Sequence, residues 1–384
     1  MHNTPRNLVI VLSILSIMLA CLASCTVNPI SYNSSLPDIR GELLEYASFD
    51  DQVAGIAVSR GGRIFVCFPR WDKNPAYSVA EVQVDGSLRP YPDKDWNRWG
   101  IKKDSRSDSH FIAVQSLFVD RNNVLWILDS PAPFLQGAQP IEAKLVGIDL
   151  GSDQIKKVVT LDKTVVPRNS FLRNVCVDQW ESFAYISDAG TGALIVTDLD
   201  SGVSRRVLAN DTSTKAGQVV LTIGGKELRN DQGKAVQLHV DGIALDQECA
   251  NLYYHALSAH TLYRIQTRYL DDPILSGEEL GKHVERLTDT GSADGIAMDS
   301  DDNLYLTAPE ENAIKRYRVY DNSLVTLARD DHITWPGSIS IAPNDFLYFT
   351  ASQFNRLPCF NNGKDKRIPP YKVFRVRKML MHGA

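Results

Sequence analysis

The sequence predicts an all-β protein built as a six-bladed β-propeller. The first observation is a pattern that occurs six times: a small residue, three mostly apolar residues, a polar turn and an aromatic-rich strand. The second is a further strand pattern after each copy, and the third is that no long amphipathic-helix pattern competes with these strands. Strand signals repeated in this way are typical of a propeller, in which each repeat forms one blade.

The six copies supply the first two strands of each blade. GIAVSRGGRIFVCF is the first copy, and in every copy Asp, Asn or Gly supplies the tight turn between the strands. The copies begin, at spacings of 61, 58, 68, 53 and 43 residues, at Gly55, Ser116, Asn174, Gly242, Gly295 and Ser338. A pair of β-sandwiches is the alternative architecture, but it would not explain six copies.

A third strand follows each copy. The six segments are AEVQVDG (80–86), KLVGIDL (144–150), ALIVTDL (193–199), TLYRIQT (261–267), AIKRYRV (313–319) and KVFRVRK (372–378). Most of them turn and lead into a fourth strand, but little follows the last one. We expect residues 41–50 to supply that missing strand, so that N-terminal and C-terminal strands pair, close the ring and remove two exposed sheet edges.

Composition excludes several classes of protein. The chain has 384 residues, of which 43% are hydrophobic and 23% charged, and this excludes a disordered, collagenous or polytopic membrane protein. Its net charge of −5 lacks the excess of basic residues that is typical of nucleic-acid-binding proteins, so we expect no nucleic-acid partner.

The N-terminal residues predict a targeting sequence. Residues 1–24 contain a short apolar run and end in Leu22-Ala23-Ser24 before Cys25, a spacing that resembles the bacterial lipobox. We therefore expect a lipoprotein signal peptide over 1–24, a lipidated Cys25 that begins a flexible tether over 25–40, and a single propeller domain over 41–384. A plain signal peptide is the alternative. Lipid on Cys25 predicts a protein anchored in the bacterial cell envelope, with the outer membrane favoured as the membrane. A periplasmic or extracellular location is the alternative.

The four remaining cysteines have no metal-like spacing, because Cys67, Cys176, Cys249 and Cys359 are far apart in the chain. Cys67 and Cys176 stand in apolar strand patterns, where a cysteine acts as a small buried apolar residue. The pattern favours free thiols over a disulfide.

Polar residues precede several innermost strands and are expected to converge at one mouth of the central channel. Such convergence in a concave site predicts ligand binding. The residues in question are Gln115, Arg173, Asn174, Asp241 and Asp294, with Trp335 as an apolar or cation–π wall. The alternative is structural, since Asp-Gly is common turn chemistry and each Asp can cap a neighbouring amide.

The chemistry of this set leaves the ligand open. The oxygens of Asn174, Asp241 and Asp294 suit a calcium-like divalent cation, and they suit a protonated amine equally well. Arg173 argues against a metal because it cancels charge. No nucleophile elbow, phosphate loop or dinucleotide motif is found, so no catalytic residue is assigned, no cofactor is certain, and enzymatic activity is left open.

Several segments resemble the yellow / major royal jelly protein family. They include PRWDKNPAYSVAEV (69–82), NSFLRNVCVDQWESFAYISDAGTGALIVTDL (169–199) and FNRLP (354–358), and the resemblance extends over roughly residues 40–378. The resemblance implies a six-bladed propeller, here a bacterial member of the family. It also implies a protein that binds a small molecule at the central channel, with the channel-mouth residues as contacts.

A weaker similarity links the chain to the regucalcin/gluconolactonase propellers, in which a first-repeat Glu, an Asn before Gly and an Asp before Gly hold a metal. Asp294 matches the last position, Asp241 stands at the second, and Ala54 replaces the Glu. This similarity implies a metal-dependent lactonase as the alternative function. A non-catalytic protein-interaction platform is a third possibility, although nothing in the sequence selects a protein partner.

Overall fold

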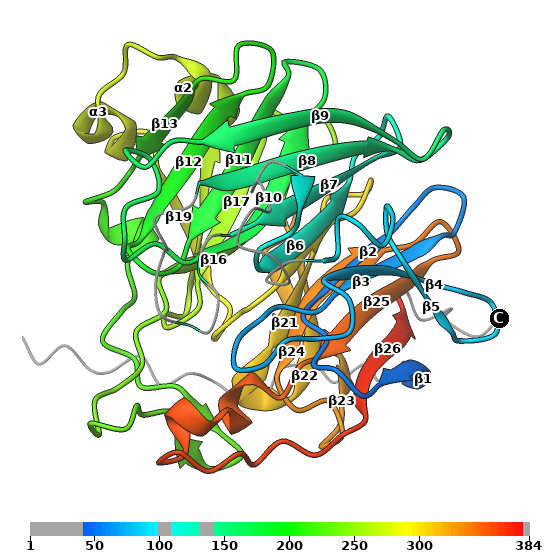
Figure 1. Ribbon diagram of the computed structural model, residues 1–384. Helices are drawn as coiled ribbons and strands as arrows, with labels where there is room; N and C mark the ends of the chain where they lie inside the picture. Colours follow the sequence, from blue (N-terminus) through cyan, green and yellow to red (C-terminus); the bar gives the residue numbers. More distant parts are fainter. Residues whose placement is uncertain (1–40, 99–108, 131, 133–134, 136–141, 379–384) are drawn as a thin grey trace, which may run out of the picture. The chain divides into compact units, whose positions relative to one another are not determined.

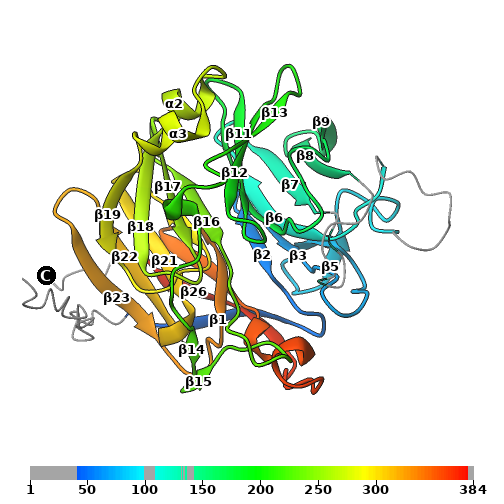
Figure 2. The same cartoon turned by 90° about the vertical axis from the view of Figure 1, so that its left-hand side faces the viewer.

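The computed structural model describes residues 41–98, 109–130, 132, 135 and 142–378. They belong to one compact unit, Pro37–Ala384, in which the strands form six four-stranded antiparallel sheets. These sheets are the six blades of a β-propeller (Figures 1 and 2), which confirms the predicted fold class. The segments predicted as a signal peptide and a tether, with Cys25 between them, lie outside the described residues.

Each of blades 1 to 5 is a run of four consecutive strands. Blade 1 consists of β2 (Gly55–Val58), β3 (Ile64–Cys67), β4 (Val79–Val82) and β5 (Leu88–Pro90). Blade 2 consists of β6 (Val114–Val119), β7 (Val124–Asp129), β8 (Ala143–Asp149) and β9 (Gln154–Leu161). Blade 3 consists of β10 (Leu172–Asp178), β11 (Phe183–Asp188), β12 (Ala193–Asp198) and β13 (Ser204–Val207).

The second half of the chain adds blades 4 to 6 and a few elements outside the blades. Blade 4 consists of β16 (Val240–Leu245), β17 (Asn251–Ala256), β18 (Thr261–Gln266) and β19 (Glu285–Asp289). Blade 5 consists of β20 (Ile296–Met298), β21 (Asn303–Ala308), β22 (Ala313–Arg318) and β23 (Ser323–Arg329). Blade 6 contains β24 (Pro336–Ile341), β25 (Phe346–Ala351) and β26 (Tyr371–Arg377). The elements outside the blades are the hairpin β14 (Thr222–Ile223) and β15 (Lys226–Glu227) and the short helices α2 (Thr267–Asp271) and α3 (Gly277–Gly281).

The ring closes between the two ends of the chain. The fourth strand of blade 6 is β1 (Leu44–Phe49), which pairs antiparallel with β26 from Leu44 opposite Arg375 to Phe49 opposite Tyr371. The Phe49 ring also meets the ring of Phe68, next to blade 1, edge-on at 5.5 Å. The predicted pairing of N-terminal and C-terminal strands is therefore confirmed.

The small residue at the start of each repeat allows the innermost strands of neighbouring blades to approach closely. A Cβ on Gly295 would lie 2.4 Å from the carbonyl oxygen of Gly337, and one on Gly242 would lie 2.7 Å from that of Asp294. Real Cβ atoms do not come so close to backbone, so a larger residue would push two blades apart at the axis.

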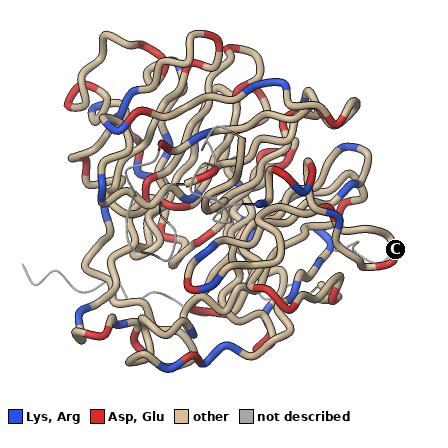
Figure 3. Tube along the Cα trace, in the orientation of Figure 1, with Lys and Arg blue, Asp and Glu red and all other residues tan. Residues whose placement is uncertain are grey.

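The aromatic residues of the repeats pack between blades. Tyr253, Tyr254, Tyr305 and Tyr348 are all buried. Cys67, Cys176 and Cys249 are buried as well, Cys359 is partly buried, and all four are free thiols. Lys and Arg are interspersed with Asp and Glu along the described chain (Figure 3). None of the helices among the described residues has the length and apolar character that crossing a membrane requires.

Candidate functional site

Three charged residues from three different blades meet near the axis. Arg173 lies in β10, Asp241 in β16, and Asp294 stands two residues before β20. The Nε atom of Arg173 lies 3.1 Å from Oδ2 of Asp241, and its Nη2 atom lies 3.0 Å from Oδ1 of Asp294. All three side chains are buried, so one guanidinium bridges two buried carboxylates across three blades.

Two further residues complete this group, which we call the central cluster. Asn174 donates from Nδ2 to Oδ1 of Asp241 at 2.8 Å, and Trp335 donates from Nε1 to Oδ2 of Asp294 at 2.6 Å. Every oxygen of the two carboxylates thus accepts a hydrogen bond from a protein group. Five of the six residues selected from the sequence lie together, and their role in binding a ligand stays a prediction.

Aromatic rings surround the guanidinium of Arg173. Its central carbon lies 5.3 Å from the ring centre of Phe171, 5.7 Å from that of Trp71 and 5.8 Å from that of Phe354. These distances are within the range of cation–π attraction. Gln115, the sixth selected residue, does not touch the carboxylates, and instead accepts a hydrogen bond from Nε1 of Trp71 at 3.0 Å.

Sequence reasoning did not assign Trp71, Phe171 or Phe354 to the site. All three stand in the segments that carry the family resemblance, PRW, NSFLR and FNRLP. These three motifs are therefore the only feature of the sequence by which the three rings could have been selected. The sequence does not indicate that the rings meet around one arginine.

Burial and charge act against each other in the central cluster. Burial raises the pKa of Asp241 above its ordinary value, and the charge of Arg173 acts in the opposite direction. Burial alone would lower the pKa of Arg173, but the carboxylates of Asp241 and Asp294 raise it above its ordinary value. The guanidinium is therefore held in its charged form.

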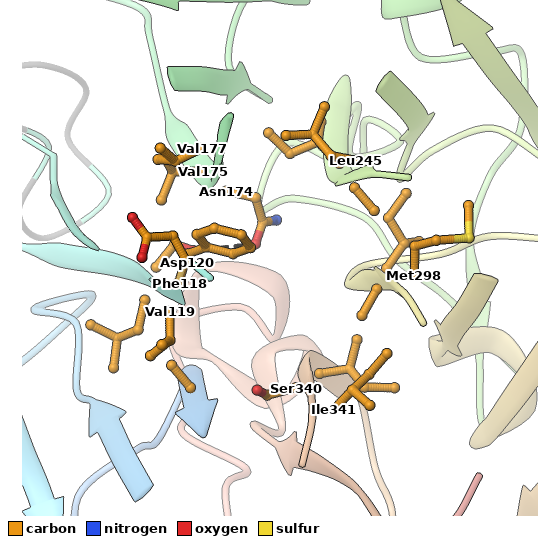
Figure 4. A pocket seen from close by; sticks show the side chains of 18 of the residues that line it. Phe118, Val119, Asp120, Asn174, Val175, Val177, Leu245, Met298, Ser340 and Ile341 are labelled. Carbon is orange, nitrogen blue, oxygen red and sulfur yellow. Dashed lines mark hydrogen bonds between the residues drawn. The ribbon is translucent and has the colours of Figure 1, made fainter. Parts of the chain in front are cut away.

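A cavity of about 230 Å³ extends along the innermost strands of all six blades. Figure 4 looks into it and shows walls of Phe118, Leu245, Met298 and other apolar side chains. Asn174 is the one member of the central cluster that lines it. The first strands of the repeats, such as SLFV, GIAL and GIAM, thus supply the walls. The residues selected from the sequence as ligand contacts stand next to the starts of these strands and do not include the wall residues.

The cavity reaches the turns that join the first and second strands of the blades, since Asp120 and Asp246 also line it. The six turns contain eight Asp or Glu residues and three Arg residues, and they span residues 59–63, 120–123, 179–182, 246–250, 299–302 and 342–345. Burial, together with the charges of Asp246 and Asp299, raises the pKa of Asp302 in one of these turns. The turns at this end of the cavity therefore contain more acidic than basic residues, and Arg121 lines the cavity beside Asp120 and Asp246.

The residues of the central cluster do not fit a divalent cation. Arg173 already lies between the two carboxylates, and Ala54, which stands at the position of the first-repeat Glu, offers no side-chain oxygen. In the described part of the chain, no three His, Cys, Asp or Glu side chains form a group that could hold a metal ion.

The fold and the site define a six-bladed propeller with an axial cavity and a buried Arg–Asp–Asp cluster. The family model of the major royal jelly proteins matches residues 112–367, and the chain belongs to that family. The predicted family resemblance is thereby confirmed.

Curated relatives come from Apis mellifera. Major royal jelly protein 7 is 27% identical over 218 residues, which are 54% of this chain and 46% of that protein. Major royal jelly protein 5 is 28% identical over 236 residues, 58% of this chain and 36% of that protein. The matched part of the chain thus spans less than half the length of these relatives.

Solved structures share the fold at low identity. A luciferin-regenerating enzyme superposes with a TM-score of 0.53 at 12% identity, covering 88% of this chain and 96% of that chain. A gluconolactonase from Xanthomonas campestris superposes with a TM-score of 0.53 at 10% identity, covering 88% and 89%. Gluconolactonases are therefore among its structural neighbours, as the second similarity predicted, and these likenesses concern the fold alone.

Proposed function

We propose that the protein binds a small molecule with an apolar body and a positively charged group in its axial cavity. The observation that carries this proposal is the cavity of about 230 Å³, to which all six blades contribute. Its volume is below the roughly 300–1,000 Å³ of common ligand pockets, so the ligand is small.

The walls and the rim select the chemistry of the ligand. Phe118, Leu245 and Met298 offer apolar surface that a ligand covers by displacing water. The acidic turns at the rim attract a cation and raise its local concentration. Toward the central cluster, Oδ1 of Asn174 accepts a single long contact of 3.5 Å from Ser116 among the described residues, and it is available to an N–H group of a ligand.

The central cluster contributes to this site mainly by orienting Asn174, its one member that lines the cavity. Arg173 holds Asp241, and Asp241 in turn accepts the amide of Asn174, so the orientation of the Asn174 side chain depends on both. Asp294, Trp335 and Gln115 act farther back, through Arg173 and Trp71. No observation on the described residues favours metal-dependent lactone hydrolysis or a protein-interaction platform over ligand binding.

Titration calorimetry with a panel of small aromatic and aliphatic amines, and with neutral analogues of the same shape, tests the proposal. We expect an amine to bind and its neutral analogue to bind at least tenfold more weakly. Met298→Trp fills part of the cavity and should abolish binding, whereas Ile274→Trp, at an 86% exposed position away from the cavity, should not. Binding that is unchanged in Met298→Trp, or a panel without any binder, would contradict the proposal.

We also propose that Cys25 carries the lipid that anchors the protein to the bacterial cell envelope. The support is the Leu22-Ala23-Ser24-Cys25 sequence, and this segment lies outside the described residues. Metabolic labelling with an alkyne fatty acid should label the native protein and not Cys25→Ser. Equal labelling of both would remove the proposal.

A further inference from the structure

The central cluster has the oxygen atoms of a cation site but holds an arginine in the middle. Asp241 and Asp294 come from neighbouring blades and are 0% and 2% exposed. Asn174 lies beside them and turns its Nδ2 group toward Asp241. Carboxylate oxygens are hard ligands of the kind that calcium binds.

The guanidinium of Arg173 donates hydrogen bonds to both carboxylates. It contacts Asp241 through Nε at 3.1 Å and Asp294 through Nη2 at 3.0 Å. The rings of Trp71, Phe171 and Phe354 lie around it and hold it in place. A free cation would have to displace the Arg173 guanidinium. This group is part of the chain and is already held by its contacts, so keeping it in place costs little additional conformational entropy.

We propose that the guanidinium of Arg173 is a built-in cation, which occupies the position that a divalent cation needs between Asp241 and Asp294 and thereby excludes one from the native protein. Removing the guanidinium leaves two buried carboxylates without a counter-charge and a space of several atoms between them. That space is a latent calcium site, formed by the carboxylates of Asp241 and Asp294. This inference does not depend on the ligand of the axial cavity.

The test compares native protein with Arg173→Ala in the presence of Ca²⁺ alone. Saturating Ca²⁺ should raise the unfolding midpoint of Arg173→Ala by about 3 °C or more and leave the native midpoint unchanged, because a ligand that binds only the folded state stabilises it. Titration with Tb³⁺ gives a second measurement. The indole of Trp335 touches Asp294, so Tb³⁺ bound in Arg173→Ala should show luminescence sensitised by tryptophan.

A matched control separates this site from the acidic turns at the rim of the cavity. In the double variant Arg173→Ala/Asp294→Asn, the Ca²⁺ shift and the sensitised Tb³⁺ signal should both disappear. If Arg173→Ala does not fold, Arg173→Gln removes the charge while it keeps most of the side-chain volume, and the same response is expected. A folded Arg173→Ala or Arg173→Gln without a Ca²⁺ response would overturn the proposal. So would a native protein whose Ca²⁺ shift is lost in Asp294→Asn.

Discussion

Replacing Arg173 by methionine tests whether the guanidinium is needed to compensate the two buried carboxylates. Methionine matches the apolar stem of arginine and lacks the guanidinium that faces Trp71 and Phe354, so the substitution mainly removes the charge and its donors. The variant leaves Asp241 and Asp294 buried without a cationic partner.

The expected loss of folding stability in Arg173→Met follows from the burial of the two carboxylates. Breaking a buried ion pair by removing one partner costs about 3–5 kcal/mol, because a charge is left without compensation in a low-dielectric environment. In the native protein Arg173 pairs with two carboxylates that are 0% and 2% exposed. We therefore expect Arg173→Met to lower the free energy of unfolding by at least about 3 kcal/mol at pH 8.

The loss should depend on pH in a defined direction. Burial already raises the pKa of Asp241 in the native protein, where Arg173 opposes the rise, and in the variant that opposition is gone. A carboxyl whose pKa is higher in the folded than in the unfolded state binds protons more tightly when folded, so lowering the pH stabilises the folded variant. The loss relative to the native protein should therefore shrink from pH 8 to pH 5.5.

Urea unfolding followed by circular dichroism at the two pH values measures both quantities. Arg173→Lys, which keeps a positive charge, is the control and should lose less stability at pH 8 than Arg173→Met. A loss below about 1 kcal/mol at pH 8, or an equal loss at both pH values, would show that the carboxylates do not depend on Arg173.

Three further predictions concern the scaffold. Asp271→Asn should stabilise the protein more at pH 8 than at pH 5, because burial raises the pKa of Asp271 to about 7 and the native protein pays for its ionisation as the pH rises through that range. Gly295→Ala should lower the unfolding midpoint by several degrees, because its Cβ would lie 2.4 Å from the Gly337 carbonyl oxygen, whereas Gly277→Ala, with no atom near its Cβ, should not. Dithiothreitol should leave the midpoint unchanged, because the four cysteines of the described chain are free thiols.

Each of these predictions has an outcome that contradicts it. Equal stabilisation by Asp271→Asn at both pH values would show that its carboxyl is not perturbed by burial. A Gly295→Ala protein as stable as Gly277→Ala would mean that the innermost strands can separate at no cost. A midpoint that falls with reductant would point to a disulfide.

The repeat pattern was sufficient to predict the blades and the closure of the ring. The alternation of small, apolar and turn residues is local chemistry, so each copy specifies its own pair of strands. Counting strands showed that the sixth repeat lacks a fourth strand after KVFRVRK (372–378), and β1 is that strand. The hairpin β14–β15 and the short helices α2 and α3 have no repeat pattern, and the sequence analysis did not predict them.

The site was only partly predictable, because its geometry depends on contacts between distant segments. Equivalent positions in the repeats indicated that Arg173, Asp241 and Asp294 approach the axis. Their pairing spans 68 and 121 residues and depends on side-chain lengths and blade angles that no local pattern encodes. The rings of Trp71 and Phe354 come from segments outside the repeats, so no equivalent position pointed to them.

A crystal structure of the native protein soaked with the amine that binds most tightly would locate the ligand directly. We predict density in the axial cavity, with the apolar body against Phe118, Leu245 and Met298 and the charged group toward the acidic turns. Density for the amine only at another surface, with the cavity unoccupied at saturating concentration, would contradict binding in the axial cavity.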